Sequence, residues 1–127
     1  MADKINMYDK IIPKGSKVEI QVDSGVSAGT EFSSTQEPDD GYKFCISYFK
    51  LTVPEEVEAN VIVETEKGET VLLSENVTND TVVIDASDFR GLDYLDSFTL
   101  YVKTTTTTTD TRTVTLEYSG KQVIPYI

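Results

Sequence analysis

Hydrophobic and polar residues alternate along much of the chain with a period of two, the pattern of half-buried β-strands. In residues 17–22, Val18, Ile20 and Val22 share one face, and charged or amide side chains occupy the other. Residues 98–105 repeat the pattern, with Phe98, Leu100 and Val102 on one face. Because successive side chains on a strand point to opposite faces, both segments are predicted to be strands that cover a hydrophobic core.

One segment, residues 42–53, is apolar on both faces and predicts a central strand. Strict alternation gives two sets, which are Phe44, Ile46 and Tyr48 on one face and Cys45, Phe49, Leu51 and Val53 on the other. Such a strand is expected between two packed layers, or between the sheet and an arm of the chain. Pro54 lacks a backbone N–H and is expected to end it.

Turn-forming residues divide the rest of the chain. Gly68 predicts a hairpin between residues 61–65 and 69–74, and Asn79 predicts a turn before a strand at 81–85. Further along, residues 98–105 are expected to form a hairpin with 111–118, and Ser119-Gly120 to turn the chain into a last strand at 121–127. Two segments fall outside this pattern and are predicted to be a long loop at 23–41 and a single helical turn within 85–96.

About eight short strands with almost no helix indicate an all-β fold, either a single antiparallel β-sandwich or a jelly roll. A length of 127 residues suits one domain. We expect an extended N-terminal arm at residues 1–16, followed by the β-sandwich domain at 17–127.

The arm carries more apolar residues than a free tail needs, and these are Ile5, Met7, Tyr8, Ile11 and Ile12. Pro13 and Gly15 would break a helix here. The arm either folds back over its own domain or docks onto a neighbouring subunit. The second possibility makes these five residues candidates for binding a protein partner.

Residues 104–109 are an unbroken run of six threonines. β-Branched side chains suit a pleated sheet, so this region is predicted to be strand, tight turn and strand. A mucin-like tract would be rich in proline, and no proline lies between Pro54 and Pro125. If the strand lies at a sheet edge, its backbone could pair with another chain, which makes Thr104, Thr106 and Thr108 candidate partner-binding residues.

Composition removes most catalytic chemistry from consideration. The chain has no histidine and one cysteine, Cys45, so histidine-dependent catalysis and cysteine clusters for zinc or iron–sulfur centres are excluded. We expect neither an enzyme nor a cofactor. With Lys plus Arg at 11 and Asp plus Glu at 22, the net charge is −11, which makes nucleic acid and anionic membranes poor partners.

Two groups of acidic residues are candidate sites. The segment 85–96 offers oxygen ligands for calcium, but Phe89 and Arg90 stand where an EF-hand loop needs a ligand and a glycine, so no metal site is predicted. Carboxylate pairs for glycoside hydrolysis could form among Asp39, Asp40, Glu55, Glu56, Glu64 and Glu66. Acidic runs in turns serve solubility in most proteins, and solvated turns are the expectation here.

These observations favour a non-catalytic structural or assembly protein, such as a small accessory or capsid-decoration protein of a virion. Its partner would be protein, either a second copy in a homo-oligomer or a larger shell. The first residues contain no secretory signal, so a virion or cytoplasmic location is expected. The alternative is a carbohydrate- or protein-binding module of a cell-surface or secreted protein that uses exposed Tyr42, Tyr94 or Tyr101, and the third possibility is a small enzyme using carboxylates alone.

Overall fold

The computed structural model describes residues 9–73, 75–85 and 94–125, and these form eight β-strands. In chain order the strands are β1 (Lys10–Val22), β2 (Glu31–Gln36), β3 (Lys43–Val53), β4 (Val57–Thr65), β5 (Thr70–Leu72), β6 (Asp80–Asp85), β7 (Leu95–Thr104) and β8 (Arg112–Val123). The all-β prediction is confirmed. No helix long and apolar enough to cross a membrane occurs among the described residues.

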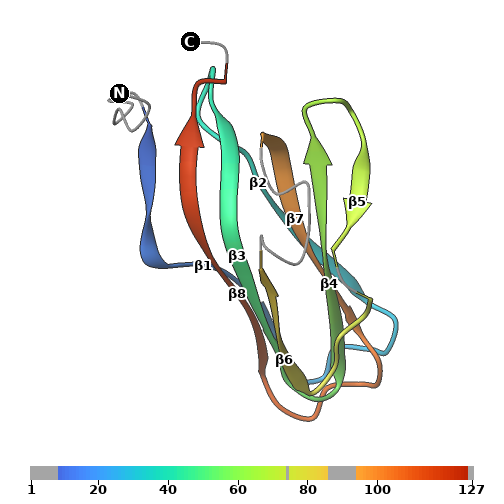
Figure 1. Ribbon diagram of the computed structural model, residues 1–127. Helices are drawn as coiled ribbons and strands as arrows, with labels where there is room; N and C mark the ends of the chain where they lie inside the picture. The colour runs from blue at the N-terminus through green and yellow to red at the C-terminus, as the bar shows by residue number, and fades with distance from the viewer. Residues whose placement is uncertain (1–8, 74, 86–93, 126–127) are drawn as a thin grey trace.

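The strands form two four-stranded groups in which every pairing is antiparallel. One group has the order β1-β8-β3-β6 and the other the order β2-β7-β4-β5. A single pair, Phe44 and Leu95, joins β3 to β7 and so links the two groups. Figure 1 shows the groups as two layers, with the chain crossing from one layer to the other after most strands. This strand order is that of a jelly roll, one of the two architectures that the sequence left open.

The core fills the space between the layers. Phe98 of β7 lies at its centre, with ring centroids 5.2 Å from Phe44, 5.0 Å from Phe49 and 4.9 Å from Tyr118. Phe98 and Phe49 are fully buried, and burial of each ring contributes about 1.5–3 kcal/mol. Since β3 and β8 belong to one sheet and β7 to the other, these contacts hold the two sheets together.

A β-bulge in β3 changes which of its residues face the core. Ile46 pairs with Gly120 and Tyr48 pairs with Ser119, so Ser47 is an extra residue without a partner in the register. The extra residue shifts the alternation by one position. Phe44 and Ile46 before the bulge and Phe49 after it are therefore all buried on the same face, and the predicted division into two apolar faces is wrong.

Gly120 is the residue that allows this bulge. It pairs with Ile46 on one side and with Ile12 on the other, where β1 is also bulged between Ile12 and Ser16. A Cβ atom on Gly120 would lie 2.1 Å from the Cys45 carbonyl oxygen, and its φ is +142°. The predicted turn at Ser119-Gly120 is wrong, because β8 continues through both residues to Val123.

Two other predictions of strand position are corrected. β1 begins at Lys10 and not at residue 17, because the bulge around Pro13 and Gly15 lets the strand continue pairing with β8 on both sides. The predicted loop at 23–41 contains β2, whose short polar sequence gave no hydrophobic alternation strong enough to identify it. Of the predicted arm, residues 1–8 lie outside the described residues.

The hairpin between β4 and β5 is confirmed, with Gly68 at φ +79° and its N–H donating to the Thr65 carbonyl. The strand at residues 81–85 is also confirmed as β6, entered through Asn79 at φ +50°. The predicted hairpin of 98–105 with 111–118 is wrong. β7 pairs with β2 and β4, whereas β8 pairs with β1 and β3 in the other sheet. The predicted helical turn falls mostly on residues 86–93, outside the described residues.

Candidate functional site

The threonine run does not form an edge strand. β7 ends at Thr104, and the rest of the run lies in the loop between β7 and β8. Thr104 and Thr108 are buried, with relative exposures of 1% and 3%, whereas Thr106 is exposed. Two of the three threonines predicted to bind a partner therefore have side chains that face their own domain, and Thr106 alone is available to a partner.

Thr108 holds the first half of the β1–β2 loop. Its Oγ1 donates to the Asp23 carbonyl at 2.6 Å and accepts from the Val26 N–H at 2.9 Å. Its backbone carbonyl accepts from the Gly25 N–H at 2.7 Å, and its N–H donates to the Val26 carbonyl at 3.0 Å. One threonine thus satisfies four backbone groups of a four-residue turn.

Thr104 repeats the arrangement on the next four residues. Its Oγ1 donates to the Ser27 carbonyl at 2.6 Å and accepts from the Thr30 N–H at 2.9 Å. Its carbonyl accepts from the Gly29 N–H at 2.8 Å, and its N–H donates to the Thr30 carbonyl at 3.0 Å. The signal in the sequence is the spacing of four that Gly25 and Gly29 share with Thr104 and Thr108.

The apolar residues of the predicted arm are divided between core and surface. Ile12 is buried in the core at 8% exposure, whereas Ile11 is 75% exposed. Both belong to β1, which pairs with β8 at these positions. Ile5, Met7 and Tyr8 lie outside the described residues, so their predicted role in docking stays a prediction.

The three tyrosines named as candidate recognition residues differ in their surroundings. Tyr42 is half-buried, and the Lys10 ammonium lies 4.4 Å above the centroid of its ring. Tyr94 is 42% exposed at the start of the described segment that leads into β7. Tyr101 is 43% exposed in the middle of β7 and lines a groove on the outer face of its sheet.

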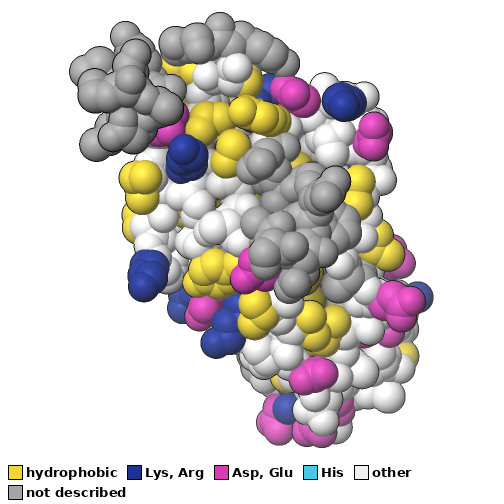
Figure 2. All heavy atoms as spheres, in the orientation of Figure 1, with side chains coloured by type: hydrophobic (Ala, Val, Ile, Leu, Met, Phe, Trp, Pro, Cys, Tyr) yellow, Lys and Arg dark blue, Asp and Glu magenta, His cyan; other side chains and the backbone are white. Residues whose placement is uncertain are grey.

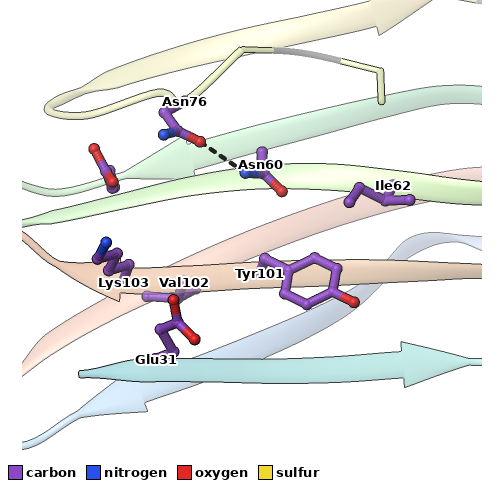
Figure 3. A pocket seen from close by; sticks show the side chains of 8 residues that line it. Glu31, Asn60, Ile62, Asn76, Tyr101, Val102 and Lys103 are labelled. Atoms are coloured by element: carbon purple, nitrogen blue, oxygen red, sulfur yellow. Dashed lines mark hydrogen bonds between the residues drawn. The ribbon is translucent and has the colours of Figure 1, made fainter. Parts of the chain in front are cut away.

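This groove has a volume of about 380 Å³ and is the candidate functional site (Figure 3). Its lining comes from β2, β4, β7 and the segment before β6, and comprises Glu31, Glu58, Asn60, Ile62, Asn76, Tyr101, Val102 and Lys103. The strand register explains why these residues meet. Tyr101 is opposite Asn60 on β4, and Lys103 is opposite both Glu31 on β2 and Glu58 on β4.

Polar groups in the groove are only partly satisfied by the protein itself. Asn60 donates from Nδ2 to Oδ1 of Asn76 at 2.7 Å. The Asn60 Oδ1 atom is buried and accepts no hydrogen bond from any described residue. Buried amide oxygens are nearly always hydrogen-bonded, so the Asn60 oxygen is an exception. Asn76 is exposed, and its side chain is the amide of this pair that a ligand can reach.

The acidic residues considered for catalysis are placed apart from this groove. Glu56 forms an ion pair with Arg112 at 2.8 Å and also accepts hydrogen bonds from the backbone and side chain of Thr109. The hydrogen bond from the Thr109 N–H, followed by that from Arg112, lowers the pKa of Glu56 below its ordinary value. Glu56 therefore ties the β3–β4 turn to the β7–β8 loop, a structural role that differs from the solvated one expected.

Two other acidic residues form ion pairs with lysines. Asp39 forms an ion pair with Lys10 at 2.7 Å. Asp96, from the segment weighed as a calcium loop, forms an ion pair with Lys43. Within residues 9–73, 75–85 and 94–125, no group of three or more potential metal ligands comes together.

Comparison with known proteins gives no family. No protein-family model and no curated protein sequence matches the chain. Among solved structures, a chain of infectious bursal disease virus, Gt strain, aligns with 91% of this chain and 32% of its own length, at 13% identity and a TM-score of 0.32. A chain of the Gx strain aligns with 91% of this chain and 30% of its own, at 13% identity and a TM-score of 0.31.

A third solved structure concerns the promiscuous specificity of carbohydrate-binding modules from the β-sandwich superfamily. It aligns with 94% of this chain and 58% of its own length, at 10% identity and a TM-score of 0.32. The present chain thus spans less than two thirds of each of these proteins. TM-scores of this size carry no argument about function.

Proposed function

We propose that this chain is a non-catalytic structural protein that acts through protein–protein contacts, as a small accessory or decoration protein of a virus particle. Its partner is a second copy of the chain or an oligomeric shell. The observation that supports this proposal is the edge strand β6 and its exposed Val83. Jelly rolls are frequent in capsids, which agrees with the proposal by analogy only.

The edge strands are β1, β2, β5 and β6. β2 and β6 both lack a bulge, a proline and a lysine, and of these two only β6 carries a large hydrophobic side chain that is exposed. β1 is interrupted by the bulge around Pro13 and Gly15, and β5 is only three residues long. β6 pairs in unbroken register with β3 and, among the described strands, with no other. Its sequence contains neither proline nor lysine, and Val83 is 58% exposed. Natural edge strands are usually blocked by such devices, so an edge without them is suited to pairing with another chain.

The remaining surface favours a strand edge over a broad apolar face as the contact. Figure 2 shows the hydrophobic side chains of one face as separate small patches among polar atoms. Stable interfaces between hydrophobic faces need a larger continuous area. Backbone pairing at an edge gives affinity without such an area.

Self-association of the full chain, measured by light scattering from micromolar to millimolar concentration, tests the proposal. We expect the average mass to rise with concentration and the rise to be lost in Val83→Lys, because a lysine on an edge strand disfavours pairing. Thr113→Lys adds the same charge to an exposed position on β8, an inner strand between β1 and β3, and should associate like the parent. A constant single-chain mass throughout, or equal loss in both variants, would count against β6 as a contact between copies.

A second candidate function, a carbohydrate- or protein-binding module, is favoured by the groove around Tyr101. A tyrosine exposed beside asparagine side chains is the arrangement that this alternative needs. The two proposals use different surfaces, since Tyr101 lies on the β2-β7-β4-β5 sheet and Val83 on the other sheet.

A further inference from the structure

The outer face of the β2-β7-β4-β5 sheet carries ordered rows of side chains centred on Tyr101. The register places Ser33, Tyr101 and Asn60 side by side on β2, β7 and β4. The row on one side contains Thr35, Thr99 and Ile62, and the row on the other contains Glu31, Lys103 and Glu58. An aromatic ring is thus surrounded by hydroxyl, amide and charged groups on a rigid sheet, which holds them in fixed positions.

We infer that this groove binds a neutral saccharide through stacking on Tyr101 and hydrogen bonds to Asn60 and Asn76. This inference deepens the second candidate function and rests on it, and it is independent of the assembly proposal. Sugars present an apolar face of C–H groups together with a rim of hydroxyls. A tyrosine offers a matching combination, a flat apolar body with a polar tip.

The amide pair supplies both kinds of hydrogen-bonding group that a hydroxyl rim needs. The Asn60 Oδ1 atom lacks a donor, and Asn76 is exposed in the segment before β6. An asparagine side chain has two donor hydrogens and one acceptor oxygen, and the bond between Asn60 and Asn76 uses only one donor and one acceptor. Figure 3 shows Asn60 between Asn76 and the Tyr101 ring, so both amides lie on the same side of the ring.

The charges of the groove select against acidic sugars. Lys103 is the one cation in the lining, and it is placed between Glu31 and Glu58. The whole chain adds a net charge of −11. A ligand carboxylate or sulfate would meet a negative potential, whereas an uncharged sugar meets no such cost.

The size of the groove limits the ligand. A volume of about 380 Å³ is near the lower end of the range for small-molecule sites, which is roughly 300–1,000 Å³. A short oligosaccharide, with one or two rings over Tyr101, fits this space. Such open sites on a sheet face give weak binding, so we expect dissociation constants in the range of about 0.1–10 mM.

The test is an NMR titration of the ¹⁵N-labelled full chain with neutral disaccharides and trisaccharides built from glucose, mannose, galactose and N-acetylglucosamine. A sialylated trisaccharide serves as the acidic probe. We expect at least one neutral sugar to shift the amide signals of Tyr101, Asn60 and Lys103, and the acidic probe to shift none of them. Failure of every neutral sugar, or shifts confined to the other sheet, would overturn the inference.

Four variants, one of them a control outside the groove, connect the binding to the proposed residues. Tyr101→Ala should weaken the affinity at least about tenfold, as expected for a central aromatic anchor, whereas Tyr101→Phe should keep most of it. Asn76→Ala, in an exposed position, should weaken it by about threefold to tenfold. Tyr94→Ala removes a tyrosine of equal exposure outside the groove and should bind like the parent. Unchanged binding in Tyr101→Ala, with a normal melting curve, would refute the site.

The NMR titration tests the saccharide site and light scattering tests association, so failure of one proposal can be distinguished from failure of the other. The sugar is added at a protein concentration where light scattering gives a single-chain mass, so binding does not require association. A chain that associates but binds no sugar keeps the assembly proposal and loses this one. A chain that binds sugar through Tyr101 but stays monomeric keeps the saccharide site and loses association through β6.

Discussion

Replacement of Thr108 by valine tests whether the threonine run serves the fold or a partner. Valine has nearly the shape of threonine and lacks the hydroxyl, so the substitution removes hydrogen bonds while leaving packing almost unchanged. The lost contacts are those of Oγ1 with the Asp23 carbonyl and the Val26 N–H. If the run serves the fold, Thr108→Val must lower stability, and it must do so without affecting any partner.

The size of the effect follows from burial. Thr108 is 3% exposed, and its hydroxyl accepts a hydrogen bond from the N–H of Val26, a residue that is only half-buried. A buried polar group left without its partner costs about 1–3 kcal/mol, and partial access to water places this case in the lower half of that range. We therefore expect a loss of about 1–2 kcal/mol for Thr108→Val and a similar loss for Thr104→Val. The melting temperature should fall by roughly 4–8 °C in each.

Urea unfolding followed by circular dichroism measures these losses directly. Thr106→Val is the matched control, because Thr106 belongs to the same run but is exposed, and its change should stay within about 0.5 kcal/mol. Thr108→Ser keeps the hydroxyl and should retain more stability than Thr108→Val. If Thr104→Val and Thr108→Val were as stable as Thr106→Val, the two threonines would not hold the loop, and the interpretation of the run as structural would be refuted.

Two further substitutions test the other contacts that shape the fold. Gly120→Ala should lower the free energy of unfolding, measured by thermal unfolding, by at least about 3 kcal/mol, since its Cβ would lie 2.1 Å from a backbone oxygen. Gly25→Ala, at φ +81° with open space around it, should lower it by only about 1–2 kcal/mol through backbone strain. Equal losses in the two variants would disprove the close approach at Gly120. The hydrogen bonds that Glu56 accepts lower the pKa of its carboxyl group in the folded chain. The stability that Glu56 contributes is therefore complete above its unfolded pKa of about 4.3 and is lost as the pH falls through its folded pKa. Glu56→Gln should therefore destabilise the chain at pH 7, and its stability should approach that of the parent in acid. Glu55, whose side chain is 65% exposed, pairs with the same Arg112 at 3.4 Å, and Glu55→Gln should change stability less than Glu56→Gln does. Parallel pH profiles for Glu56→Gln and the parent would contradict the role of the Arg112 pair.

Local sequence predicted those parts of the fold that depend on neighbouring residues. The alternation at Val18, Ile20 and Val22 gave a strand, and Gly68 gave the β4–β5 hairpin, because side-chain alternation and turn conformation are decided within a few residues. The β-class of the protein followed from the number of such segments. Each of these predictions needed no knowledge of distant parts of the chain.

Predictions failed where a distant segment decided the local structure. The bulge at Ser47 depends on the close approach of Gly120, more than seventy residues away, and no residue near Ser47 predicts it. β2 is held in place by β7 and has too few apolar residues to be recognised alone. β7 and β8 are adjacent in sequence, yet the connection between them crosses from one sheet to the other, and Thr104 and Thr108 bind the distant β1–β2 loop there.

The candidate site was predicted least well, and the reason is again pairing between strands. Tyr101 could be named from the sequence as an outward residue of a strand, but its neighbours Asn60 and Ser33 come from strands far away in the chain. The chemistry of a site on a sheet face belongs to a row of residues across strands, and only the register defines that row. In this protein one such row places the Tyr101 ring beside Asn60, whose buried amide oxygen has no donor among the described residues. The exposed Tyr101 ring and the exposed Asn76 side chain come from segments distant in the sequence, so no local pattern could have placed them in one groove.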